Sequence, residues 1–110
     1  MGRPKLVRDN MPELCETTPG WTPMIWWKAS KCEMIILLEN KLSEEVEEVI
    51  DASIGRDRLR LANEIADLLE VVRAICRERK ISLKEVETIR KKKLAHRGGF
   101  KRGVVWNGEK

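Results

Sequence analysis

The chain has 110 residues, the size of one domain, and we interpret residues 1–110 as a single domain. Apolar residues make up 42% of it and charged residues 36%, which is too apolar for a disordered chain and too charged for a membrane protein. The three cysteines are an odd, widely spaced set, which argues against a disulfide framework or a zinc site. We therefore expect a reduced, cytoplasmic protein with no membrane contact.

The net charge of +4 divides into two opposed fields. Residues 33–70 carry eleven acidic and four basic side chains, a balance of −7. Residues 79–102 carry ten basic and two acidic side chains, a balance of +8. This distribution favours a cation site beside an anion site in one small domain.

Prolines punctuate residues 1–29, so we predict irregular structure there, with an extended arm or short strand at 5–9 and a helical turn near Pro12. Ser30 with Glu33 forms a capping box. It predicts a helix over about 31–54, which Gly55 ends.

A second apolar stripe predicts a helix over about 57–79, and a capping box at Ser82 predicts a third, through about His96, with Leu83, Val86 and Ile89 facing inward. The tail after Gly99 is predicted to pack on the helices as an arm. The fold class is all-α, an antiparallel helical bundle with short extended N- and C-terminal arms. The apolar positions of the first long helix cover more than one face, so we expect oligomerisation to complete the bundle.

Two pairs of carboxylates lie three residues apart on neighbouring predicted helices: Glu45 with Glu48, and Glu64 with Asp67. Residues at this spacing share one face of a helix. Four converging carboxylates suit Mg²⁺ or Mn²⁺, whereas a di-iron bundle would want Glu-x-x-His pairs. Solvated acidic faces remain the alternative. Lys41, one turn before Glu45, either pairs with that residue or reaches a bound phosphate.

The spacing Glu44-Glu45-x-x-Glu48 followed by Glu64-x-x-Asp67 resembles the EExxE…ExxD motif of the MazG-like all-α nucleoside triphosphate pyrophosphatases. The Lys5-Leu6-Val7-Arg8-Asp9 start and the Arg97-Gly98-Gly99-Phe100 end are similar to its small phosphoribosyl-ATP pyrophosphohydrolase-like branch of house-cleaning enzymes. The likeness covers about residues 5–106. Asn10 and Asn63 depart from that branch, which commonly has Lys and an acid at these positions.

The resemblance implies a Mg²⁺-dependent homodimer or homotetramer that cleaves nucleotides between the α and β phosphates, releasing a monophosphate and pyrophosphate. It implies metal ligands at Glu45, Glu48, Glu64 and Asp67. Glu44 would orient a ligand or, like Glu45, accept a proton from the attacking water, and Lys41 is assigned to the same catalytic group.

Several cationic residues and one tryptophan are candidates for substrate binding. Arg90, Lys93 and Arg97 share one side of the third helix and either hold phosphates or form a solvated face. Lys5, Arg8 and Asp9 either line the site or clamp the N-terminal arm by ion pairs. Trp27 either stacks on a base or belongs to a lid or an oligomer contact.

Two further classes of function compete with the pyrophosphohydrolase. The +8 segment also suits a nucleic-acid-binding or protein-interaction module without turnover. Against it, the acidic half of the chain would repel a nucleic-acid backbone, so we consider nucleic acid an improbable partner. An antitoxin-like or scaffold bundle is the third interpretation.

Overall fold

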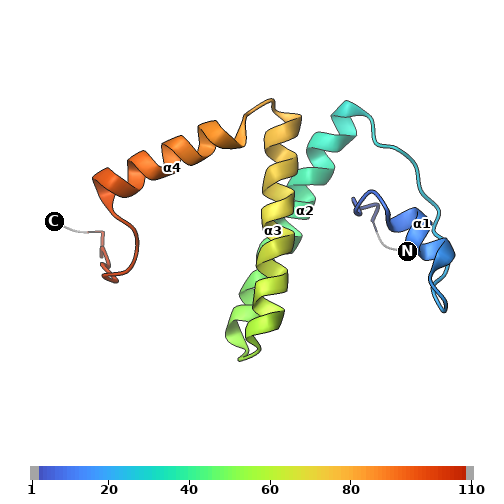
Figure 1. The fold of residues 1–110 in the computed structure, drawn as a ribbon, viewed down its shortest axis with the longest axis horizontal. Helices are drawn as coiled ribbons and strands as arrows, with labels where there is room; N and C mark the ends of the chain where they lie inside the picture. Colours follow the sequence, from blue (N-terminus) through green and yellow to red (C-terminus); the bar gives the residue numbers. More distant parts are fainter. Residues whose placement is uncertain (1–2, 109–110) are drawn as a thin grey trace.

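The computed structural model describes residues 3–108 and contains four helices in that range (Figure 1). They are α1 (Met11–Thr17), α2 (Lys31–Ile54), α3 (Arg58–Glu78) and α4 (Leu83–Arg97). The described part of the chain has no strand, so the all-α prediction is confirmed, and residues 5–9 form an arm without regular secondary structure that ends in a turn at Asp9. None of the helices within this range is long and apolar enough to cross a membrane.

Each of the three long helices begins at a side chain that accepts a hydrogen bond from its first turn. The Ser30 hydroxyl accepts from the Glu33 N–H at 3.1 Å, and the Glu33 carboxylate accepts from the Ser30 N–H at 2.9 Å. Asp57 caps α3 and Ser82 caps α4 in the same way. Because such caps satisfy otherwise orphaned N–H groups, the boundaries match the predicted ones within one or two residues.

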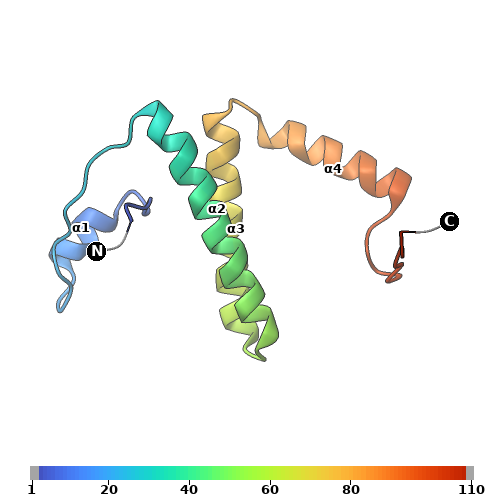
Figure 2. The ribbon, with the colours of Figure 1, turned by 180° about the vertical axis from the view of Figure 1, so that it is seen from behind.

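Helices α2 and α3 form an antiparallel hairpin, and they are the one pair with an extensive interface among the described helices (Figures 1 and 2). The least exposed positions recur every three or four residues along each helix, which defines a seam where the helices meet. On α2 the seam is Leu38, Leu42, Glu45, Val49 and Ala52. On α3 it is Leu61, Glu64, Leu68, Val71 and Ile75, and Cys76 is buried beside the end of this row.

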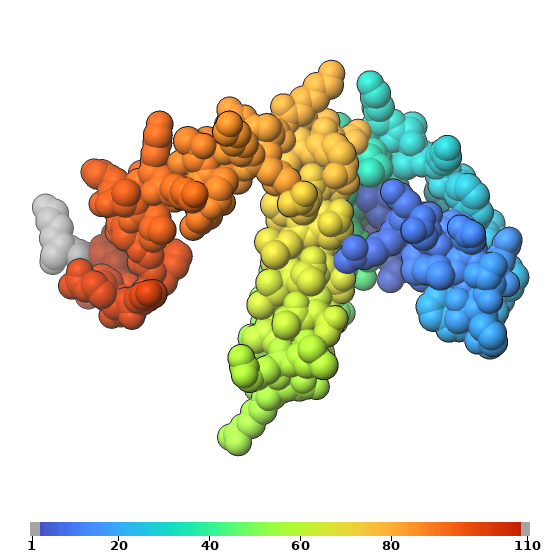
Figure 3. Space-filling model, in the orientation of Figure 1, coloured from blue at the N-terminus to red at the C-terminus, as the bar shows by residue number. Residues whose placement is uncertain are grey.

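The two sides of this hairpin differ in character. In an antiparallel helix pair, the residues that come one position after each seam residue lie on the same side of the pair in both helices. Here that side is apolar and exposed, and we call it the open face. It consists of Val46, Ile50, Ile65, Leu69 and Val72. The positions that precede the seam form the opposite, acidic side, which the N-terminal arm partly covers (Figure 3).

Helix α4 leaves the hairpin and points away from it (Figures 1 and 3). The prediction that Leu83, Val86 and Ile89 face inward is therefore wrong within one chain, since they are 37%, 37% and 49% exposed. The tail does not pack on the helices either, because Phe100 is 99% exposed. The buried apolar core of the described residues is small and lies in α2 and α3, and we find in it no partner for α4.

Candidate functional site

Three carboxylates from the facing helices converge at the middle of the hairpin. Glu45 of α2 and Glu64 and Asp67 of α3 each place a carboxylate oxygen within 4.8 Å of the other two. Glu45 and Glu64 occupy seam positions that apolar residues hold elsewhere, and Glu45 is only 7% exposed. A carboxylate in that position is costly unless something compensates its charge.

Glu48 lies next to this group without belonging to the tight set of three oxygens. The pKa of Glu64 is raised above its ordinary value, first by desolvation and then by the negative charges of Glu48, Asp67 and Glu45. Repulsion of this kind shows that negative charge is concentrated at the site. Glu45 of one predicted pair thus faces both members of the other pair, and Glu48 lies near enough to act electrostatically on Glu64.

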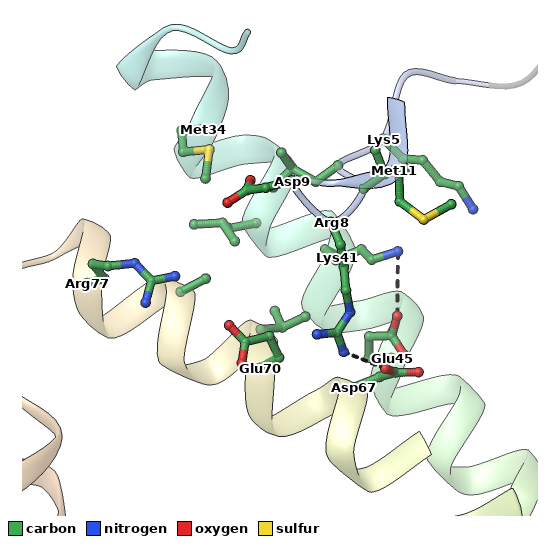
Figure 4. A pocket seen from close by; sticks show the side chains of 15 residues that line it. Lys5, Arg8, Asp9, Met11, Met34, Lys41, Glu45, Asp67, Glu70 and Arg77 are labelled. Atoms are coloured by element: carbon green, nitrogen blue, oxygen red, sulfur yellow. Dashed lines mark hydrogen bonds and ion pairs between the residues drawn. The ribbon is translucent and has the colours of Figure 1, made fainter. Parts of the chain in front are cut away.

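Three cations border the carboxylates: Lys41 and Arg8 are ion-paired with members of the group, and Lys5 is ion-paired with Glu44 beside it. Lys41 Nζ lies 3.5 Å from Glu45 Oε1 and 3.4 Å from Glu44 Oε1. Lys5 of the arm approaches the same Glu44 oxygen at 3.4 Å, so two ammonium groups bracket Glu44. Arg8 donates to Asp67 Oδ1 at 2.6 Å and reaches across from the arm to α3 (Figure 4).

A cleft of about 500 Å³ opens beside Glu45 and Asp67, between the arm and the hairpin (Figure 4). Its wall is mixed, with apolar side chains between the charged ones. The apolar and thioether residues are Leu6, Val7, Met11, Met34, Leu38, Val71 and Ala74. The charged residues are Lys5, Arg8, Asp9, Lys41, Glu45, Asp67, Glu70 and Arg77.

Glu70, Ala74 and Arg77 belong to this cleft, and the sequence analysis missed them. They continue from Asp67 at steps of three and four residues along one face of α3. Extending the Glu64–Asp67 face by the helical repeat would have found them. The apolar residues that the arm adds to the cleft could not be found in this way, because the arm is not helical.

The structure does not bring every predicted substrate-binding residue to the cleft. Arg90, Lys93 and Arg97 are exposed on α4, away from the carboxylates of the same chain (Figure 1). Trp27 lines a second hollow on the other side of the arm. Its side chain also helps to lower the pKa of Glu33, after the larger effect of the Ser30 backbone N–H.

The two residues that differ from the branch that the chain resembles lie outside the carboxylate group. Asn10 is the exposed residue before α1. Asn63 donates from its side chain to the Leu59 carbonyl of its own helix at 2.9 Å. Neither substitution removes a carboxylate from the converging set.

The residues at this site fit a hard divalent cation. The converging donors are carboxylate oxygens, the ligands that Mg²⁺ and Mn²⁺ prefer, and two helices hold them. The pKa of Glu64 is raised first by desolvation and then by the neighbouring carboxylates, and a cation would relieve the second effect. A zinc or iron site would instead draw on cysteine or histidine, and His96, the one histidine in the sequence, lies near the end of α4.

Sequence comparison identifies the chain. Residues 13–93 match the family described as phosphoribosyl-ATP pyrophosphohydrolase, which is part of the MazG-like all-α superfamily. No curated protein and no solved structure matches significantly. The matched residues contain the whole carboxylate group and Lys41, whereas Lys5 and Arg8 precede them. The match covers most of the chain and favours an enzyme over a nucleic-acid-binding module. The chain therefore belongs to the phosphoribosyl-ATP pyrophosphohydrolase family, whose members are hydrolases that act on acid anhydrides in nucleotides.

Proposed function

We propose that the protein is a Mg²⁺-dependent nucleoside triphosphate pyrophosphohydrolase. It cleaves between the α and β phosphates and releases a nucleoside monophosphate and pyrophosphate. The observation that carries the proposal is the convergence of Glu45, Glu64 and Asp67 within 4.8 Å, beside a cleft rimmed by cations. A role in removing nonstandard nucleotides fits the house-cleaning branch that the sequence resembles.

Glu45, Glu64 and Asp67 hold the cation in this proposal, and Glu48 is the fourth ligand. When bound, Mg²⁺ neutralises phosphate charge and acidifies a coordinated water. Glu44 stands beside the group with its carboxylate held by Lys5 and Lys41. From that position it orients the attacking water and accepts its proton, a role it shares with Glu45.

The arm and α2 supply positive charge for the phosphate chain. Lys5 and Lys41 lie on the α2 side of the carboxylates, and Arg8 lies on the α3 side. The guanidinium of Arg8 presents two parallel N–H donors, which match a phosphate. Its ion pair with Asp67 Oδ1 supports this role, because it places the guanidinium beside a proposed metal ligand, where phosphate oxygens would also lie.

The nucleoside occupies the apolar part of the cleft. Leu38 and Val71 form its floor beside the carboxylates, and Met34 extends it away from them. About 500 Å³ is the volume range of small-ligand sites. Trp27 borders the neighbouring hollow and is a second candidate surface for the base.

A homodimer or homotetramer is the proposed active form. The open face exposes apolar side chains, of which Ile50 is 54% and Leu69 is 57% exposed. A contiguous apolar face of this kind is typical of a surface that another chain covers. The small core of a single chain supports the same conclusion.

Pyrophosphate release with Mg²⁺ from a panel of standard and modified nucleotides tests the proposal. Asp67→Asn and Glu48→Gln should lower the rate on the order of a hundredfold, because each removes a charged ligand. Glu47→Gln is the matched control, since Glu47 is exposed on the same helix and outside the carboxylate group. Release from no nucleotide, or equal rates in all four proteins, would contradict the assignment.

A further inference from the structure

The N-terminal arm brings a cation to one of the converging carboxylates. Arg8 donates to Asp67 Oδ1 at 2.6 Å, and Asp67 belongs to the set of three that gathers between α2 and α3 (Figure 4). The two residues are 59 positions apart in the sequence, so their ion pair ties the arm to the hairpin. A positively charged guanidinium therefore lies beside the oxygens that would attract a divalent cation.

Side-chain cations serve as counter-ions of the carboxylates when no metal is bound. The carboxylates in or beside the converging group are Glu44, Glu45, Glu48, Glu64 and Asp67, and the described cations paired with members of this group are Lys5, Arg8 and Lys41. Negative charge is thus in excess even with these cations in place. The excess agrees with the raised pKa of Glu64, to which repulsion by neighbouring carboxylates contributes after desolvation.

Arg8 is the exchangeable member of these counter-ions. Lys41 belongs to α2 and its side chain is only 20% exposed, so it is fixed with the hairpin. Lys5 is paired with Glu44, which stands beside the converging set. Arg8 pairs with a member of that set, yet its side chain is 60% exposed and it lies on a segment without regular secondary structure. Because an ion pair this exposed contributes little stability, Arg8 can leave Asp67 while the hairpin stays folded.

Arg8 loses its attraction to Asp67 when a divalent cation shares that carboxylate. The negative charge of the carboxylate is then neutralised, and the guanidinium is repelled by a charge of its own sign. Linkage makes the effect reciprocal: if a bound cation weakens the Arg8–Asp67 pair, the pair weakens cation binding by the same factor. A phosphate chain has the opposite effect, because its oxygens offer the guanidinium a new acceptor beside the cation.

We propose that Arg8 competes with the metal ion for Asp67: it pairs with this carboxylate when no cation is bound, gives it up when a divalent cation binds, and then transfers to the phosphate chain of the substrate. Cation binding therefore frees the arm, and the arm returns over the site with the nucleotide. Arg8 acts first as a positioning residue of the arm and then as a substrate-binding residue. The transfer to phosphate rests on the proposed function, whereas the competition for Asp67 needs only a cation at the carboxylates.

Titration calorimetry with Mn²⁺ and no nucleotide tests the competition. Arg8→Ala should bind Mn²⁺ about fivefold more tightly than the parent protein, because the cation no longer displaces a guanidinium. The matched control is Lys5→Ala, which removes one charge from the same arm but from a partner outside the converging set. In physiological salt, which screens exposed charges more than about 8 Å apart, it should change the affinity by less than about twofold.

Two results of this titration would overturn the competition alone. They are equal affinities of Arg8→Ala and the parent, and an equal tightening in Lys5→Ala, which would make general charge the cause. If neither Arg8→Ala nor the parent binds Mn²⁺, the competition and the proposed metal site are overturned together.

Binding of inorganic triphosphate in excess Mg²⁺ tests the transfer to phosphate. This probe carries the phosphate chain without a base, so the result does not depend on which nucleotide is preferred. Arg8→Ala should weaken its binding about tenfold, since a charge-assisted hydrogen bond is lost. One substitution thus moves two affinities in opposite directions, which a merely structural role of Arg8 would not do.

A loss of both affinities in Arg8→Ala would overturn the proposal, because Arg8 would then only help to build the site. Unchanged triphosphate binding would overturn the transfer. A parent protein that binds Mn²⁺ but no triphosphate counts against the proposed function and overturns the transfer with it, and the calorimetry then decides the competition by itself.

Magnetic resonance of the arginine side chains follows the displacement directly. The guanidinium signal that disappears in Arg8→Lys belongs to Arg8. Addition of Mg²⁺, which is diamagnetic, should move this signal toward its position in metal-free Asp67→Asn, where the carboxylate partner is absent. A signal that keeps its metal-free position at a Mg²⁺ concentration that saturates the site would overturn the displacement of Arg8, even if both affinities change as expected.

Discussion

Lys41 is the most enclosed cation of the site, and removing its charge should destabilise the metal-free protein. Its side chain is 20% exposed, and that of its partner Glu45 is 9% exposed, with 3.5 Å between Nζ and Oε1. Lys41→Met keeps the aliphatic stem and removes the ammonium group. The change leaves Glu45 at a seam position with no compensating charge at that distance.

The expected loss of stability follows from the burial of this ion pair, which lies between that of a fully buried pair and that of an exposed pair. At an effective dielectric constant of about 20, two unit charges this far apart attract by about 5 kcal/mol before desolvation is subtracted. Removing one partner of a fully buried pair costs about 3–5 kcal/mol, and an exposed pair contributes about 0–1 kcal/mol. We expect Lys41→Met to lower the free energy of unfolding by about 2 kcal/mol.

Urea unfolding with a chelator present, followed by circular dichroism, measures this loss. The protein concentration is held constant because assembly contributes to stability. Lys31→Met, at an exposed position in the first turn of α2, should change the stability by less than about 0.5 kcal/mol. In a Glu45→Gln background the cost of Lys41→Met should fall below about 1 kcal/mol. An equal cost in both backgrounds would refute the reasoning, because the loss would then not arise from the Lys41–Glu45 pair.

Three further predictions concern protonation, capping and thiol access. The raised pKa of Glu64, whose ordinary value is 4.5, means that the folded state keeps a proton that the unfolded state has lost. The melting temperature of the metal-free protein should therefore fall as pH rises through the range just above 4.5, and it should fall less in Glu64→Gln. An equal dependence of melting temperature on pH in that variant would contradict the assignment to Glu64. Ser30→Ala should lower the free energy of unfolding, measured by chemical denaturation, by about 1 kcal/mol. The control Ser53→Ala should lower it by less than about 0.5 kcal/mol, and equal losses in the two variants would exclude a stabilising effect of the Ser30 cap. A thiol reagent should label exposed Cys32 in the folded protein and buried Cys76 only on unfolding, and rapid labelling of both would show that α3 is not packed as described.

The helices and the carboxylate group could be predicted from the sequence because their determinants are local. Ser30 and Ser82 cap helices through contacts three residues away, and the boundaries followed. Glu64 and Asp67 share a helical face by spacing alone. A short connection after Gly55 made the two helices antiparallel neighbours, which placed that face opposite Glu45.

The position of α4 could not be predicted, because it depends on which surface covers an amphipathic side rather than on the helix itself. Val86 and Ile89 are inward-facing positions by pattern, yet both are exposed in the part of the chain that the structure describes. The ion pairs of the arm could not be predicted either, since Arg8 and Asp67 are 59 residues apart in the sequence. Residues far apart meet only through the path of the intervening chain, which periodicity does not describe.

The arm and the hairpin differ in how firmly they are held, and this sets the order in which the site opens. The arm is joined to the hairpin by ion pairs whose side chains are more than one-third exposed, such as Arg8–Asp67, whereas a seam with buried residues holds the hairpin. Segments with exposed contacts open at a lower free energy than packed ones. Amide hydrogens of residues 5–9 should thus exchange with solvent before those of the α2 and α3 seams. Throughout such openings the seam keeps the carboxylates assembled, so the cation of the proposed function would exchange on the timescale of the arm while the hairpin keeps its form.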